Sequence, residues 1–283
     1  MSSLKKVKIV TDSTCDLPVE VIEALDIIVV PLKVYMDEET FTAGVDLTPE
    51  EFYEKMPKLK DTPSTNPPSP ALFFEAYEDA ADEAETIISI HISRLMSLTI
   101  ESARQARSML PHMDIRVYDS KTTGASLGLI ILRAAWAVKE GKNIDEVCTV
   151  IDEAIEKVVV LGFPSTLRYL VKGGRIGRAR GLVGQLLGRV PILTVTEGET
   201  DSVTTVPGRE GAMDWIIEHL KTEGLDSTSL IALTHGDMPD VTNQFKLRLE
   251  ETFGCKPQYT GLVGPVVGAH LGPGSLFFTY MKK

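Results

Sequence analysis

Hydrophobic and polar positions follow two rhythms along the first half of the chain. Short runs rich in β-branched residues predict strands at 7–10, 27–34, 86–92 and 115–118. Helical spacing of apolar residues between these runs predicts helices at 18–25, 49–56, 70–84, 98–110, 124–139 and 145–158. Strands that alternate with helices favour a parallel α/β sheet.

The second half has a different pattern. Strands are expected at 159–163, 191–196, 202–206, 229–234, 257–260 and 275–281, and helices at 210–223 and 239–253. Glu197-Gly198-Glu199, between two of these strands, predicts a hairpin turn. We therefore predict an α/β protein of two domains. Residues 1–160 form an N-terminal parallel α/β domain, and residues 161–283 form a C-terminal α+β domain with a mixed or antiparallel sheet.

Charge and composition narrow the possible partners. The formal net charge is −11 at pH 7, which disfavours nucleic acid or an anionic membrane as a general partner. No apolar run approaches the ~20 residues that cross a bilayer, and the N-terminus lacks the apolar stretch of a signal peptide. Cys15, Cys148 and Cys255 are widely spaced and form no disulfide or metal motif. We expect a cytoplasmic protein without an integral membrane segment.

Two polar loops in the first half could hold an anion. The first runs from Ser64 to Pro70 and combines hydroxyls with prolines; alternatively it is a linker in which Ser69 caps the next helix. The second runs from Ser93 to Thr99 and precedes a helix, whose free amides and dipole favour a carboxylate or phosphate. Ser97 could donate its hydroxyl to such an anion or serve only as a helix cap.

Two further loops lie in the second half. Between Phe163 and Thr196 there is no acidic residue, and the cations are Arg168, Lys172, Arg175, Arg178, Arg180 and Arg189. This segment is either a docking surface for an anionic ligand or partner, or a solvated face that pairs with the protein's own acids. The other loop, Gly268–Ser275, places His270 in an expected tight turn, where an imidazole could bind an anion.

Two other patterns have simpler interpretations. Asp12-Ser13 and Asp119-Ser120 follow predicted strands, and we interpret them as caps without a metal. Gly124-Ala125-Ser126-Leu127-Gly128 matches the G-x-S-x-G motif of serine hydrolases, and Asp237 and His270 would complete the chain order of a triad. A nucleophile elbow requires the serine directly after a strand, however, and Ser126 lies well beyond Tyr118.

Taken in order, these loops resemble the DegV family of bacterial lipid-binding proteins over essentially the whole chain. The motifs that carry the resemblance are Val10-Thr11-Asp12-Ser13-Thr14, Ser64-Thr65-Asn66-Pro67, Ile92–Thr99, Val117-Tyr118-Asp119-Ser120, Leu170–Ile176 and Ala269–Gly274. Each motif is weak alone, but six in this order are specific.

The resemblance implies a two-domain fold of the EDD type, with a long-chain fatty acid such as palmitate between the domains and no other cofactor. It implies a monomeric, non-enzymatic binding protein that presents the carboxylate to a separate ATP-dependent kinase. That kinase would form an acyl phosphate for phospholipid synthesis. By this analogy Ser64, Ser97 and His270 contact the carboxylate. Residues implied to support the site or dock the partner are Thr65, Ser93, Arg94, Thr99, Lys172, Arg175 and Arg178.

The chain departs from the family pattern in places. The usual Thr-Ser-Gln-Pro is matched to Ser64-Thr65-Asn66-Pro67, Leu98 replaces a residue that is free to take unusual backbone angles, and Arg94 replaces a serine. Two alternatives remain: a serine esterase that uses Ser126, and a lipid-free regulatory module that uses the Arg168–Arg189 cluster.

Overall fold

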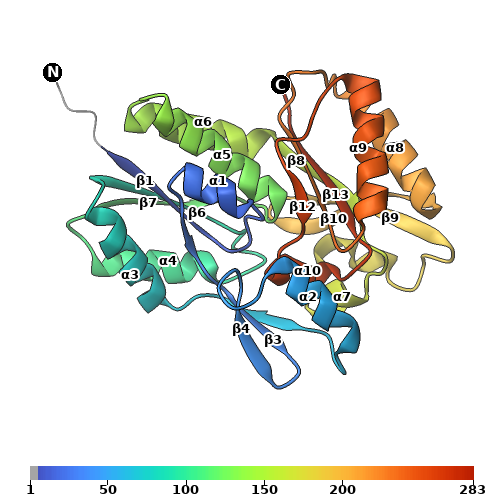
Figure 1. Cartoon of the computed structure of the whole chain (residues 1–283), viewed down its shortest axis with the longest axis horizontal. Coiled ribbons are helices and arrows are strands. Elements are labelled where there is room, and N and C mark those ends of the chain that lie inside the picture. Colours follow the sequence, from blue (N-terminus) through green and yellow to red (C-terminus); the bar gives the residue numbers. More distant parts are fainter. Residues whose placement is uncertain (1–5) are drawn as a thin grey trace.

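A computed structural model describes residues 6–283 and places a parallel sheet in the first half of the chain (Figure 1). The order of its strands is β2 (Ile28–Val30), β1 (Val7–Asp12), β6 (Thr86–His91), β7 (Asp114–Asp119). Helices α3 (Pro70–Ala81) and α4 (Thr99–Met109) cover one face. Helices α1 (Val19–Ala24), α5 (Ala125–Lys139) and α6 (Ile144–Lys157) lie on the other face.

Alternating side chains explain why this sheet is covered on both faces. Ile9 and Ile88 pack into the core beneath α5 and α6, whereas Val10 and Ile87 pack into the core beneath α3 and α4. Successive side chains of a strand point to opposite faces, and parallel sheets are buried on both. The carboxyl ends of β1 and β6 are thereby held side by side.

The second half forms a six-stranded mixed sheet. Its order is β10 (Glu199–Pro207), β9 (Arg189–Thr196), β8 (Val158–Phe163), β13 (Leu276–Met281), β11 (Ile231–His235), β12 (Thr260–Leu262). Neighbouring strands are antiparallel except for β11 and β12. Helices α8 (Gly208–Thr222) and α9 (Pro239–Phe253) pack on it around Ile216, Phe245 and Phe278. The predicted α/β fold with a parallel and a mixed sheet is confirmed.

Helix α5 lies between the two large sheets and contacts strands of both. Most of its side chains are buried all round, including Leu127, Leu129 and Ile131. A helix that is apolar on every side is a core helix. The parallel sheet and the mixed sheet therefore share one core element.

The prediction of a single strand over 27–34 is wrong. Pro31 divides it into β2 and β3 (Lys33–Met36), because proline cannot donate a backbone hydrogen bond. Strand β3 pairs with β4 (Glu39–Thr42) and with β5 (Ser64–Asn66) in a small antiparallel sheet. These two partners are short and polar, so no hydrophobic pattern marked them. The predicted loop from Ser64 to Pro70 therefore begins with a strand.

The small sheet is joined to the second half of the chain. Its Val34 and Met36 pack with Phe52 of α2 (Pro49–Lys55) and with Val266 of α10 (Pro265–Leu271). Because α10 ends at Leu271, His270 lies in the last turn of this helix and not in the expected tight loop.

Three short helices complete the fold. The Gly- and Arg-rich stretch contains α7 (Arg168–Lys172) and η2 (Gly177–Leu182), and η1 (Met56–Lys58) follows α2.

The division at residues 1–160 and 161–283 remains a prediction. The strands of the parallel sheet end at Asp119 and those of the mixed sheet begin at Val158. Within residues 6–283 no helix is long and apolar enough to cross a bilayer.

Candidate functional site

A cavity lies between the two large sheets. The empty space among its lining residues measures about 930 Å³, counting the part that opens to solvent. Pockets for small-molecule ligands are lined mostly by apolar side chains. Its apolar lining consists of Leu32, Pro67, Ile92, Met96, Ala125, Val160, Leu170, Leu193, Val195, Val263, Val266, Val267, Leu271 and Phe277. This lining suits a long aliphatic ligand.

One end of the cavity carries a hydroxyl and an imidazole from distant parts of the chain. Thr65 Oγ1 lies 2.9 Å from His270 Nε2, and both residues line the cavity. Strand β5 and helix α10 are in contact, which brings these side chains together. From the sequence, Ser64 was the predicted contact of the ligand carboxylate and Thr65 a supporting residue.

Ser64 is exposed and lies outside the cavity lining, so the structure does not bring it to His270. Ser64, Thr65 and Asn66 form β5, where adjacent side chains point to opposite faces. If the family pattern Thr-Ser-Gln-Pro is aligned one residue later, its Thr falls on Thr65 and its Pro on Pro68. The alignment matters because a shift of one residue along a strand places the matched side chain on the other face.

His270 is uncharged at neutral pH. Burial, together with a smaller effect of the neighbouring Arg175 cation, lowers the pKa of its imidazole to about 4. Its Nδ1 is buried without a hydrogen-bond partner among the described residues. A Cβ on Gly173 would lie 2.2 Å from this atom, so only glycine leaves room for the ring. The imidazole is thus held as a neutral donor or acceptor.

Arg175 links the Gly-Gly-Arg segment to the helix-start loop of the first half. Its Nε donates to the Met96 carbonyl at 3.0 Å, and its Nη1 donates to the Gly173 carbonyl at 2.6 Å. These bonds hold the guanidinium at the cavity wall beside His270. A cation and a neutral imidazole at one end of an apolar cavity favour an anionic headgroup.

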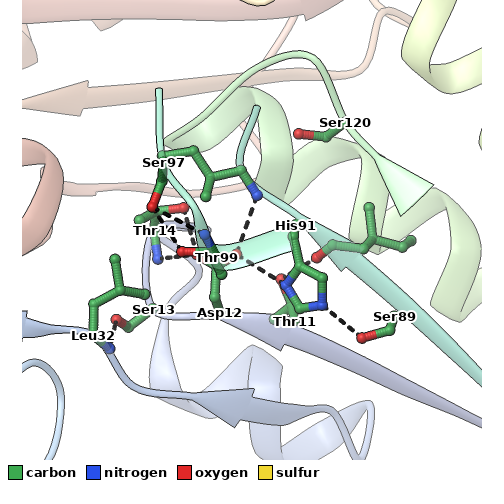
Figure 2. Close-up of polar contacts among 12 residues, drawn as sticks. Thr11, Asp12, Ser13, Thr14, Leu32, Ser89, His91, Ser97, Thr99 and Ser120 are labelled. Atoms are coloured by element: carbon green, nitrogen blue, oxygen red, sulfur yellow. Dashed lines mark hydrogen bonds and ion pairs between the residues drawn. The ribbon is translucent and has the colours of Figure 1, made fainter. Parts of the chain in front are cut away.

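Ser97 also lines the cavity, immediately before α4. Its Oγ lies 2.8 Å from Thr99 Oγ1 and accepts from the Thr99 amide at 3.3 Å (Figure 2). Leu98 is the N-cap residue and has φ −80° and ψ 8°, angles that are open to any L-residue. The replacement at Leu98 is therefore accommodated without strain, and Thr99 orients Ser97.

Ser93 and Arg94 have other roles in the structure. The Ser93 hydroxyl donates to the Gly198 carbonyl at 2.7 Å and so ties this loop to the β9–β10 hairpin. Gly198 has φ +88°, and a Cβ there would lie 2.5 Å from the Ser93 hydroxyl. Arg94 is exposed and pairs with Asp119 at 3.6 Å. Neither residue belongs to the cavity lining.

The cationic segment is partly neutralised by the protein's own acids. Lys172 pairs with Asp61, and Arg178 pairs with Glu197 and, at 3.4 Å, with Glu199. Arg168 and Arg180 are exposed and form no ion pair within residues 6–283. The segment thus combines paired cations with free ones near the cavity.

The geometry does not assemble a hydrolase around Ser126. Its hydroxyl is buried in the first turn of α5, where it donates to the Thr123 carbonyl at 2.7 Å and contacts Thr122 Oγ1 at 2.7 Å. The His270 Nε2 that would serve it is bonded to Thr65, and Asp237 is exposed. The three residues of the motif hypothesis therefore do not meet.

A serine, a histidine and an aspartate do meet elsewhere, in the interior of the first half (Figure 2). Ser89 Oγ lies 2.6 Å from His91 Nε2, and His91 Nδ1 lies 3.0 Å from Asp12 Oδ2. All three side chains are fully buried, and Tyr77 OH lies 2.8 Å from the Ser89 hydroxyl. Asp12 also accepts from the backbone amides of Thr14 and Ile92. This network ties β1 to β6 and is closed to substrates.

The interpretation of Asp12 and Asp119 as helix caps is wrong, because the N-cap residues of α1 and α5 are Pro18 and Gly124. Both carboxylates instead accept hydrogen bonds from amides of the turn that follows their own strand. Asp119 Oδ1 accepts from the amide of Lys121 at 3.0 Å, and Ser13 Oγ accepts from the amide of Leu32 at 2.9 Å. No cluster of His, Cys, Asp and Glu that could hold a metal occurs within the described part of the chain.

Comparison with known proteins identifies the family. The family model described as an uncharacterised protein of the DegV family matches residues 6–283. The chain belongs to the DegV family. A DegV domain-containing protein of Caldanaerobacter subterraneus is 32% identical over 281 residues, covering 99% of this chain and 100% of the relative.

Solved structures of the family superpose on nearly the whole chain. A DegV family protein from Thermus thermophilus, described as binding fatty acid, has a TM-score of 0.90 at 28% identity and covers 98% of this chain and 99% of that one. A stearic-acid-binding protein from Eubacterium ventriosum has a TM-score of 0.89 at 26% identity, with 98% of each chain covered. The relatives of this DegV protein are thus described as fatty-acid-binding proteins.

Several polar residues of the cavity lining were not predicted from the sequence. Asp16, Thr123 and Thr279 line the cavity, and each has a buried side-chain oxygen without a partner among the described residues. Asp16 follows Cys15 in the turn after β1, and Thr123 precedes the glycine that starts α5. Single polar residues at such positions carry no pattern, because only the packing of both sheets brings them to one space.

Proposed function

We propose that the protein binds a long-chain fatty acid in this cavity, with the carboxylate held by Thr65, Ser97, His270 and Arg175. The observation that carries the proposal is the cavity itself, which is lined mostly by apolar side chains and brings these four polar groups close to one another. Burial of an aliphatic tail contributes ~0.8 kcal/mol per CH₂, and a buried carboxylate needs hydrogen-bond donors.

The chemistry at the carboxylate end supports binding rather than catalysis. Thr65 and Ser97 supply hydroxyls, and the neutral His270 can donate one N–H without changing charge. Protonation of His270 is favoured once an anion lies beside it, which would strengthen the interaction. The hydroxyl of Ser97 is bonded to Thr99 and that of Ser126 to Thr122 and Thr123, so neither is bonded to an imidazole that could accept its proton.

The same proposal includes presentation of the carboxylate to a separate ATP-dependent kinase in the cytoplasm. In this function the protein is a monomeric carrier rather than an enzyme, and the kinase forms the acyl phosphate for phospholipid synthesis. Arg168 and Arg180 are exposed cations in a segment without acidic residues. Their charge supports docking of a partner whose own surface is acidic.

Native mass spectrometry tests the ligand. Protein purified without added lipid should carry a long-chain fatty acid such as palmitate, and delipidated protein should rebind it. Ser97→Ala and Thr65→Val should each lower affinity about 10- to 100-fold, since hydrogen bonds to charged groups contribute ~1.5–3 kcal/mol. Ser64→Ala is the matched control and should bind like the wild type. Absence of any bound or rebound fatty acid would contradict the proposal.

The carrier role is tested separately. The fatty-acid-loaded protein is incubated with ATP and a cell extract, and acyl phosphate is trapped with hydroxylamine. Arg168→Glu combined with Arg180→Glu should reduce acyl phosphate formation while fatty acid affinity stays unchanged. Lys221→Glu on α8, a similarly exposed charge reversal, should leave formation unchanged. Equal formation by all three proteins would argue against this partner surface.

A further inference from the structure

The cavity proposed for the fatty acid has polar lining groups besides those assigned to the carboxylate. Within residues 6–283, three of its lining side chains have a buried oxygen without a hydrogen-bond partner: Asp16 Oδ2, Thr123 Oγ1 and Thr279 Oγ1. Buried polar groups in proteins are almost always paired, so three orphaned oxygens in one cavity require an explanation. A purely aliphatic tail would leave all of them unpaired.

Asp16 is fixed in place and directed to the cavity. Its Oδ1 accepts from the Gly264 amide at 3.0 Å, which anchors the carboxyl to the start of α10. Its Oδ2 lies on the side of Gly124, where a Cβ would approach it to 3.3 Å, and Thr123 is the preceding residue. The free oxygens of Asp16 and Thr123 thus lie at the N-terminus of α5, on the cavity wall.

Helix α10 connects the Asp16 group with the carboxylate site. Its N-cap residue Gly264 contacts Asp16, and His270 lies six positions later. At ~1.5 Å per residue, Gly264 and His270 are about 9 Å apart along the helix axis. Val266 and Val267 line the cavity between them. The ligand that fits this arrangement is polar at both points and apolar in the segment between.

Resting on the proposed function, we propose that the preferred ligand is a long-chain fatty acid with a hydroxyl in the middle of its chain, recognised by Asp16 and Thr123. A separation of about 9 Å corresponds to roughly seven C–C bonds of an extended chain, which advances ~1.25 Å per bond, and so places the hydroxyl near carbon 8. A hydroxyl there donates to one oxygen and accepts from the other. Burial raises the pKa of Asp16 to about 7, so its carboxyl can act in either role near neutral pH.

Competition binding tests the inference. Delipidated protein is titrated with octadecanoic acid, with 8-hydroxyoctadecanoic acid and with 2-hydroxyoctadecanoic acid, whose hydroxyl lies at the carboxylate end. The mid-chain hydroxy acid should bind about tenfold more tightly than the parent acid, as expected for one added hydrogen bond in a buried site. The 2-hydroxy acid should show no such gain.

Isosteric variants assign the effect to residues. Thr123→Val should bind the mid-chain hydroxy acid and octadecanoic acid with equal affinity, and its affinity for octadecanoic acid should match that of the wild type. Thr123→Ser should restore the preference for the hydroxy acid. Asp16→Asn retains an acceptor for Gly264 and should keep part of the preference. Equal binding of parent and hydroxy acids by the wild type would overturn the inference and mean that water alone pairs these oxygens. If neither acid binds, the proposed function itself fails.

Discussion

The role of an individual side chain in this protein depends on the face of the helix or strand from which it projects. Thr65 and Ser64 differ by one position in β5, yet Thr65 contacts His270 and Ser64 is exposed. The hydroxyl pair Ser97 and Thr99 could be recognised from its place before a helix. By contrast, Asp16 has φ +49°, a conformation that aspartate tolerates better than most residues. This turn aims its carboxyl into the cavity, and no sequence pattern indicated it.

The raised pKa of Asp16 makes folding stability depend on pH. Burial raises this pKa from its ordinary value near 3.8 to about 7. Between about pH 4 and pH 7 the unfolded chain releases the proton while the folded protein keeps it, so stability falls as pH rises through this window. Asp16→Asn should remove this decline, which is worth no more than about 4 kcal/mol at pH 8. Urea denaturation at pH 5 and pH 8 measures it.

Asp237→Asn is the matched control for this prediction. Asp237 also has a positive φ, of 56°, and is exposed. Its variant should keep the pH dependence of the wild type. The explanation would be wrong if Asp16→Asn retained the same loss of stability between pH 5 and pH 8.

At the scale of elements, short segments that the hydrophobic pattern did not mark hold the site together. Strand β5 is three residues long, and α10 contains glycine and proline, so neither has a clear periodicity. Strand β5 pairs with β3 and contacts α10, and α10 also packs on α2, with Val34 of β3, Phe52 and Val266 in a shared core. The long amphipathic helices and buried strands were predictable because their burial is periodic.

The approach of α7 to α10 leads to a prediction at this scale. A Cβ at Gly173 would lie 2.2 Å from His270 Nδ1, so Gly173→Ala should displace the imidazole and lower fatty acid affinity tenfold or more. Overpacking of this kind also costs ~1–3 kcal/mol of stability. Isothermal titration with palmitate and urea denaturation measure the two effects.

Gly181→Ala provides the comparison, because nothing lies within 4 Å of a Cβ at that position and its φ is not positive. That variant should bind and unfold like the wild type. Unchanged palmitate affinity in Gly173→Ala would show that the position of His270 does not control binding.

On the scale of the whole molecule, one helix and one cavity join the two halves. Helix α5 packs on both large sheets, and the cavity takes Ser97 from the first half and His270 from the second. The Ser93 hydroxyl and the Gly198 carbonyl add a direct tie between the halves. A ligand in the cavity should therefore stabilise both halves at once.

Thermal unfolding should be a single transition with and without ligand, because the shared α5 core couples the halves. A fatty acid at 100 times its Kd should raise the unfolding free energy by about 2.7 kcal/mol. Calorimetry measures the shift, and hydrogen exchange should show added protection in both α4 and β13. Two separate transitions, only one of which moves with ligand, would contradict this coupling.

The sequence by itself determined the α/β class, the long helices and strands, and the family, because these depend on local periodicity and on ordered motifs. It also placed Ser97 and His270 among the ligand contacts that we now propose. Only the tertiary structure decided that Thr65 and not Ser64 meets His270, and that Asp16, Thr123 and Thr279 share the cavity. The physical reason is that a binding cavity is formed by contacts between residues far apart in the chain, and local patterns do not record such contacts.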